Sequence, residues 1–160
     1  MRTITVAIRR SCAISALALI AQFSPRAHAA LGEDVSAIAN DQARLQASLQ
    51  VRQNVRQNLH FAVHELSSPI GIKIREFVAE SGRVFAVSWS GGWRPNLRDI
   101  MGEHYDRFIA GTRGRRMAHG PVRIDLPGMV VVMGGHQRAF FGHVYLTALV
   151  PADLALEDLQ

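Results

Sequence analysis

The feature that most limits how this chain can fold is an alternation of apolar and polar residues in two separate stretches. The first covers residues 59–89 and the second covers residues 122–145. Alternation with a period of two places successive side chains on opposite faces of a strand, so both stretches predict β-strands joined by short turns. Between them, residues 97–109 carry apolar side chains at helical spacing, which predicts an amphipathic helix.

Turn residues divide each stretch into three strands. In the first stretch the turns fall at residues 67–71 and 80–83, and the parity of the apolar residues slips near Glu76, which indicates a β-bulge. In the second stretch they fall at residues 126–129 and at Gly134-Gly135. Residues 129–133 are apolar on both faces, which favours a central strand.

The region before the first strand has a helical period. Apolar residues recur at heptad-like spacing over about 35–50, which predicts a helix there. A tandem repeat, Val-Arg-Gln-Asn twice over residues 51–58, either extends that helix or links it to the first strand. We therefore predict an α+β fold in a single domain. Its antiparallel sheet consists of two three-stranded meanders in the order α-βββ-α-βββ, with the helices packed on one face.

The first 29 residues have the order of a secretory signal peptide. A basic start is followed by an apolar run of about a dozen residues and by the small-residue site Ala27-His28-Ala29. We predict cleavage between Ala29 and Ala30, leaving residues 30–160 as a periplasmic or secreted domain with no transmembrane segment. Because a spanning helix needs roughly 20 apolar residues, an uncleaved membrane anchor is the less favoured alternative. Twin-arginine export through Arg9-Arg10 is another alternative.

Removing the leader changes the charge and the thiol content. Four of the 18 lysines and arginines lie in the leader and all 13 acids follow it, which leaves 14 basic against 13 acidic residues. This balance gives no reason to expect nucleic-acid binding, which needs a clustered basic excess. The single cysteine, Cys12, also leaves with the leader, so the mature chain has no disulfide and no thiolate metal ligand.

No local sequence signature names a reaction. The chain contains no G-x-S-x-G, no H-E-x-x-H, no Walker loop and no dinucleotide-binding glycine fingerprint. We therefore predict no metal and no cofactor. A non-catalytic binding or accessory module is favoured over an enzyme, and its partner is an envelope protein or a small ligand.

Two loops are the candidate contact surfaces. Trp93 and Arg94 follow two glycines in a loop, where a large aromatic residue is unusual, and exposed aromatic–arginine pairs often anchor a partner. The alternative is that Trp93 folds back as a lid on the sheet edge. The hairpin over residues 134–138 supplies His136 and Arg138 as further binding candidates.

The histidines supply the competing hypothesis, a metal-dependent or hydrolytic enzyme of the envelope. His136, His143 and an acid would carry this activity, and His64, Arg75 and His143 are the alternative site. On a strand, His60 and His64 would lie about 13 Å apart, too far to chelate one ion, so exposed histidines are the simpler interpretation. His104 falls on the buried stripe of the predicted helix, which favours a hydrogen-bonded core histidine.

Several blocks taken together resemble a known family. They are His64-Glu-Leu, Arg75-Glu-Phe-Val, Pro95-Asn-Leu and Gly134-Gly-His-Gln-Arg-Ala-Phe, behind a leader and an Ala30-Leu-Gly start. In this order they resemble the small exported proteobacterial proteins known as domain of unknown function 2844, over essentially the whole chain after the leader. The resemblance implies export but no established activity, so it assigns no catalytic residue. An acid is common in that family where Asn96 stands here, and either residue caps a helix.

Overall fold

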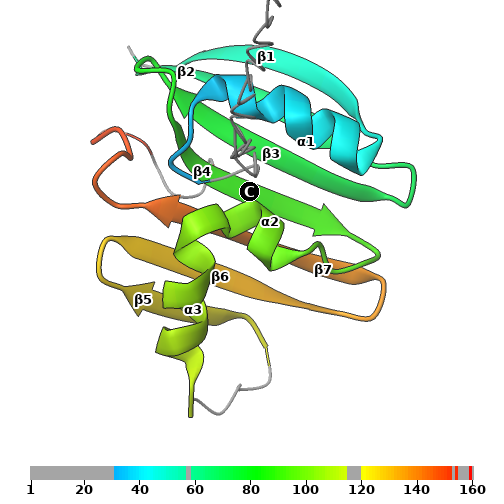
Figure 1. The fold of residues 1–160 in the computed structure, drawn as a ribbon, viewed down its shortest axis with the longest axis vertical. Helices are drawn as coiled ribbons and strands as arrows, with labels where there is room; N and C mark the ends of the chain where they lie inside the picture. The colour runs from blue at the N-terminus through cyan, green and yellow to red at the C-terminus, as the bar shows by residue number, and fades with distance from the viewer. Residues whose placement is uncertain (1–30, 57–58, 115–119, 153, 155–158, 160) are drawn as a thin grey trace, which may run out of the picture.

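The computed structural model of this protein describes residues 31–56, 59–114, 120–152, 154 and 159. The predicted cleavage site at Ala29 and Ala30 lies outside this part. The described residues form one antiparallel sheet of seven strands with helices beside it, an α+β fold (Figure 1). The elements in chain order are η1 (Val35–Ala37), α1 (Ile38–Leu45), β1 (Ser48–Arg56), β2 (Leu59–Ser67), β3 (Ile72–Ala79), β4 (Val84–Gly91), α2 (Leu97–Met101), η2 (Gly102–His104), α3 (Tyr105–Thr112), β5 (Val122–Leu126), β6 (Met129–His136) and β7 (Ala139–Leu146).

The strands follow the order β1-β2-β3-β4-β7-β6-β5. The first four strands form one meander, and β5, β6 and β7 form a second one that runs back toward the first. The chain leaves β4 at the middle of the sheet, passes through α2 and α3 and starts β5 at the far edge. As a result β7 pairs with β4, which joins the two meanders into one sheet.

The predicted first helix was too long, and one strand was missed. The helix predicted over about 35–50 ends at Leu45, where Gln46 takes a left-handed conformation with φ 48°. Residues of the tandem repeat then belong to the edge strand β1 rather than to a helix extension or a linker. The first meander therefore has four strands instead of three. The second has the predicted three.

The helix predicted after Pro95 begins as expected but is interrupted. The Asn96 side chain accepts a hydrogen bond from the Arg98 N–H and caps α2. The chain then passes through Gly102, where φ is 52°, and a 3-10 turn precedes α3. A positive φ is costly for residues other than glycine, so Gly102 is the point where this break is easily made.

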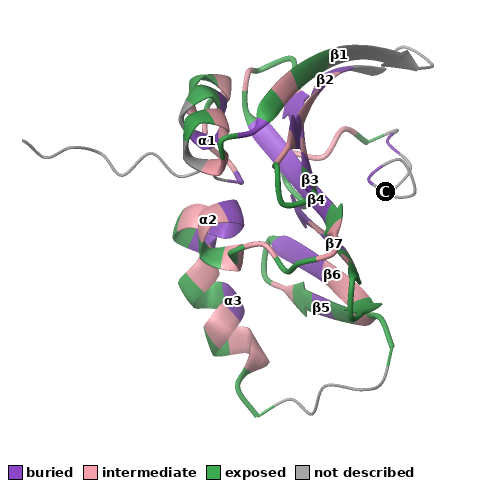
Figure 2. Ribbon diagram, turned by 90° about the vertical axis from the view of Figure 1, so that its right-hand side faces the viewer, coloured by how far each residue is buried: buried purple, intermediate pink, exposed green. Residues whose placement is uncertain are grey.

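Both faces of the sheet carry apolar clusters. On one face, here called the helix face, strand residues pack against α1, α2 and α3 through Ile38, Met101 and Phe108 (Figure 2). The opposite face is here called the back face. On it, an aromatic group of Phe61, Phe77 and Phe85 is joined by two buried residues from the C-terminal segment, Leu154 and Leu159. The helices lie on one face, as predicted, and the sheet is buried on both sides.

The turns set the register of the strands. The bulge predicted near Glu76 falls between Phe77 and Val78, where the β3–β4 register shifts. The turn predicted at Gly134-Gly135 lies further along the chain. Strand β6 continues to His136, and Gln137 and Arg138 make the two-residue turn into β7.

Candidate functional site

The structure brings the two predicted contact loops together. Gly91, at the end of β4, pairs with Phe140 at the start of β7, and Phe140 also pairs with Gly135 of β6. A Cβ atom on Gly92 would lie 3.8 Å from the carbonyl oxygen of Arg138. Residues 91–94 and 134–138, about 40 positions apart in the sequence, therefore form one corner of the molecule, here called the loop corner.

An arginine–aromatic contact links the two halves of the loop corner. The Arg94 guanidinium lies over the Phe140 ring, with its Cζ atom 4.7 Å from the ring centroid, a cation–π geometry. Beside it is an open groove of about 390 Å³, which falls within the size range of small-ligand sites. The side chains that line the groove include Trp89, Arg94, Pro95, Leu97, Val122, Met133, Phe140 and Phe141.

The other predicted residues of the loop corner point into solvent. Trp93 is 65% exposed, so the indole does not fold back as a lid. His136 is exposed, and its Nδ1 atom lies 3.0 Å from the Gln137 carbonyl oxygen. Arg138 is exposed and takes a left-handed conformation with φ 67° in the turn. Such a conformation is uncommon for a residue other than glycine, asparagine or aspartate. Backbone strain of this kind often occurs at functional sites, so Arg138 is a candidate for a functional role.

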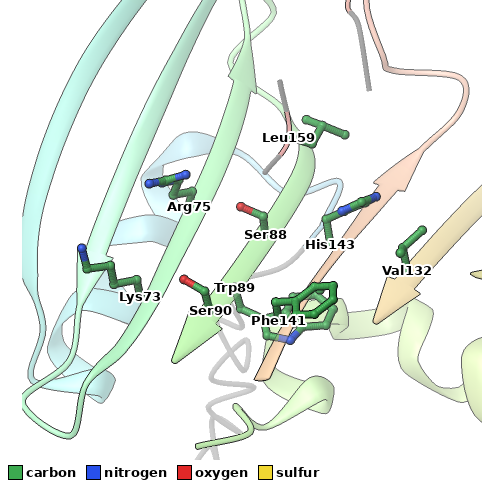
Figure 3. Close-up of a pocket in the computed structure, with 10 residues that line it drawn as sticks. Lys73, Arg75, Ser88, Trp89, Ser90, Val132, Phe141, His143 and Leu159 are labelled. Carbon is green, nitrogen blue, oxygen red and sulfur yellow. The ribbon is translucent and has the colours of Figure 1, made fainter. Parts of the chain in front are cut away.

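A second polar region lies on the back face, where three central strands align two rows of side chains. One row joins Lys73 of β3, Ser90 of β4 and Phe141 of β7. The other row joins Arg75, Ser88 and His143 in the same strand order. Each row thus presents a cation, a hydroxyl and a ring. Together the six residues, here called the back-face array, border a hollow of about 170 Å³ (Figure 3).

Neighbouring charges shape this array. The Arg75 Nε atom donates to Glu65 Oε2 at 3.0 Å, which anchors the guanidinium beside β2. Burial lowers the pKa of His143, and the positive charge of Arg123 lowers that pKa further, so the imidazole is neutral near pH 7. The ring of His143 is also stacked on Tyr145, with centroids 6.2 Å apart.

The alternative site predicted from His64, Arg75 and His143 divides between the two faces. Arg75 and His143 lie in one row of the back face, whereas His64 pairs with Glu76 in the neighbouring row and therefore belongs to the helix face. His64 is half-buried rather than exposed, and burial lowers its pKa. The side chain of His60, the other member of the suggested metal pair, lies outside the described part.

The histidines of the enzyme hypothesis also stay apart. His136 pairs with Ala139, and His143 stands four residues further along β7, about 13 Å away at 3.3 Å per residue. Within the described residues, no three His, Cys, Asp or Glu side chains gather closely enough to hold one metal ion. His104 is a buried histidine, as predicted, and its Nδ1 atom accepts a hydrogen bond from Arg107 Nη2 at 2.6 Å.

Sequence reasoning missed the back-face array because a strand pattern does not give the register. The period of two places Lys73 and Arg75 on one face of their strand, and likewise Ser88 and Ser90. The pattern cannot say which residue of β3 lies opposite which residue of β4. The adjacent Phe140 and Phe141 could have indicated a second site. Neighbouring residues on a strand face opposite sides of the sheet, so one of the two rings had to lie on the back face.

The fold and its two polar regions define a single-sheet α+β protein with an exposed aromatic–arginine corner. None of the helices in the described residues is long and apolar enough to cross a membrane. The chain belongs to the family described as "Protein of unknown function (DUF2844)", which it matches over residues 27–159. No curated protein and no solved structure matches it.

Proposed function

We propose that residues 1–29 export this protein to the cell envelope, where residues 30–160 act as a non-catalytic binding module. The basic start, short apolar run and Ala27-His28-Ala29 site of the leader support the export step. To test it, the protein is isolated from periplasmic and culture fractions and its N-terminus is sequenced. A chain that begins at Ala30 is the expected result. An intact leader on protein that stays in the cytoplasm or the membrane would contradict the proposal.

The observation that carries the binding function is the convergence of the two loops beside an exposed tryptophan. Trp93 is 65% exposed and precedes Arg94, which lines the groove, and tryptophan and arginine are enriched among the residues that dominate binding at protein interfaces. Arg94 and Arg138 add positive charge, and residues 91–96 and 134–141 contain no acid. The partner that complements this surface is an acidic protein segment that presents an apolar side chain to Trp93 and the groove.

The first test compares Trp93→Ala and Arg94→Ala with Val51→Ala, which removes an exposed apolar side chain from the distant edge strand. Envelope extract is passed over each immobilised protein. The two loop-corner variants should lose a partner that the unaltered protein and Val51→Ala retain, and raised salt should release that partner. Melting temperatures should stay close together. Equal capture by all four proteins would contradict this site.

The second test uses the conformation of Arg138. Glycine accommodates φ 67° without strain, so Arg138→Gly should raise the free energy of unfolding by about 1 kcal/mol. The same change should weaken partner binding because the guanidinium is lost. Gln46→Gly is the matched control: its φ of 48° gives a similar gain in stability, far from the loop corner. If both glycine variants bind equally well, Arg138 has no part in recognition.

A further inference from the structure

The back-face array is the strongest feature that the proposed binding function leaves unexplained. It lies across β3, β4 and β7, on the face opposite the helices, and its residues come from the middle of the sheet. Much of the rest of this face is apolar and packs against Leu154 and Leu159. The array therefore interrupts an apolar face with two parallel rows of side chains, each a cation, a hydroxyl and a ring.

The chemistry changes in one direction across the hollow. In Figure 3, Lys73 and Arg75 project from β3 along one side, Ser88 and Ser90 occupy the floor on β4, and Phe141 and His143 stand on β7. Lys73 on β3 and Phe141 on β7 are both exposed, so one end offers a charged group and the other an accessible ring. A ligand that fits this gradient has an anionic end over β3 and an apolar ring over β7.

The charge around the hollow favours an anion. Among the described residues, its lining contains two cations and no carboxylate. Glu65, which pairs with Arg75 from the neighbouring strand, reduces the charge of these described side chains to one positive unit when His143 is neutral. Lys73 is exposed at the rim, and its flexible ammonium can reach an incoming oxygen. The serine hydroxyls supply hydrogen-bond donors between the two ends.

The size of the hollow limits the ligand. At about 170 Å³ the hollow is smaller than the 300 Å³ or more of typical drug-sized sites. We infer that the back-face array binds a small amphipathic anion, a carboxylate carried on one apolar ring. Phe141 lines both this hollow and the groove beside the loop corner, but the inference does not rest on the proposed partner.

The test titrates the purified protein with four probes while amide NMR signals are followed. Benzoate carries both the charge and the ring, benzamide keeps the ring without the charge, acetate keeps the carboxylate without the ring, and inorganic phosphate supplies charge alone. Benzoate should shift the signals of Ser88, Ser90 and His143 saturably, with a Kd on the order of 1 mM. The other three probes should bind at least about tenfold more weakly.

Two variants test whether the positive charge of Lys73 is needed for binding. Lys73→Gln should weaken benzoate binding by about five- to tenfold. Arg113→Gln, which removes an exposed cation after α3, should leave binding unchanged. The inference is overturned if benzoate gives no saturable shifts, if benzamide or phosphate matches benzoate, or if both variants bind as the unaltered protein does. These outcomes do not depend on whether Trp93 and Arg94 capture a partner.

Discussion

At the scale of single residues, Gly142 shows how closely the centre of the sheet is packed. A Cβ atom at this position would fall on the indole of Trp89, and it would lie 2.7 Å from the carbonyl oxygen of Val132. Trp89 is buried in the helix-face cluster, so its ring has little room to move. The absence of a side chain at residue 142 is therefore what allows the Trp89 ring to pack directly against β7.

Gly142→Ala is expected to lower the free energy of unfolding by about 1–3 kcal/mol because of this overlap. Gly92→Ala is the control, since the nearest atom to its added Cβ is 3.8 Å away. Urea denaturation of both variants measures the difference. When Trp89→Phe is combined with Gly142→Ala, the loss of stability should be smaller than the sum of the two single losses, because the smaller ring relieves the overlap. Equal stability of the two alanine variants would contradict this account.

His104 gives the molecule a pH dependence of known sign. Burial and the nearby charge of Arg107 lower the pKa of His104 below its ordinary value of 6.5. The unfolded chain then takes up more protons than the folded chain as the pH falls through this range, so acid favours unfolding. The contribution of His104 to stability is complete above pH 6.5 and is lost between 6.5 and its lower folded pKa. Burial lowers the pKa values of His64 and His143 as well.

The urea midpoint should therefore fall when the pH is lowered from about 7.5 to about 5.5, with each unit of lowered pKa costing about 1.4 kcal/mol. His104→Gln keeps a side chain able to accept from Arg107 and removes the titration. Its midpoint should change less steeply with pH than that of the unaltered protein. An identical pH slope would show that His104 is not the titrating group.

At the scale of elements, the end of α1 explains where prediction from the sequence failed. The apolar spacing of residues 35–50 continues past Leu45, but the helix ends there. The N–H of Gln46, the next residue, donates to the Ala43 carbonyl oxygen, and the Ala47 N–H donates to the Gln42 carbonyl oxygen. Helices often end at a glycine in this conformation, and glutamine gives no such signal. Strand β1, which follows, repeats valine every four residues and contains arginine and glutamine, which are good helix formers, so its sequence also fits a helix pattern.

The substitution Gln46→Gly should therefore stabilise the protein, by about 0.5–1 kcal/mol, because it removes the cost of a left-handed glutamine. Gln42→Gly, inside the same helix, should instead destabilise it by about 1 kcal/mol. Thermal and urea unfolding of the two variants measure both signs. If Gln46→Gly is as destabilising as Gln42→Gly, the helix does not end at residue 46.

At the scale of the whole molecule, local patterns predicted the strands better than their arrangement. The alternation in residues 59–89 and 122–145 identified six of the seven strands in the described part. The pairing of β4 with β7 depends on contacts between residues far apart in the chain, which no local period encodes. Both polar regions follow from that pairing, since it brings Phe140 beside Gly91 and His143 beside Ser88. The individual residues could be proposed from the sequence, but their grouping could not.

The back face of the sheet is covered in part by residues that follow β7. Leu154 and Leu159 are both buried in the back-face cluster with Phe61, Phe77 and Phe85. The sheet therefore lies between the helices on one side and these C-terminal leucines on the other. Because the sequence has only one cysteine, no disulfide can form within the chain, so burial of apolar surface on both sides of the sheet must supply most of the stability.

Because Leu159 is fully buried, Leu159→Ala should consequently cost about 2–5 kcal/mol. Urea denaturation measures this loss, and Val51→Ala, at a position 52% exposed, should change stability by no more than about 0.5 kcal/mol. Exposure of the Phe61, Phe77 and Phe85 rings should also increase binding of a dye that fluoresces on apolar surfaces. A Leu159→Ala protein as stable as Val51→Ala, with no added dye binding, would mean that the back face does not need its C-terminal cover.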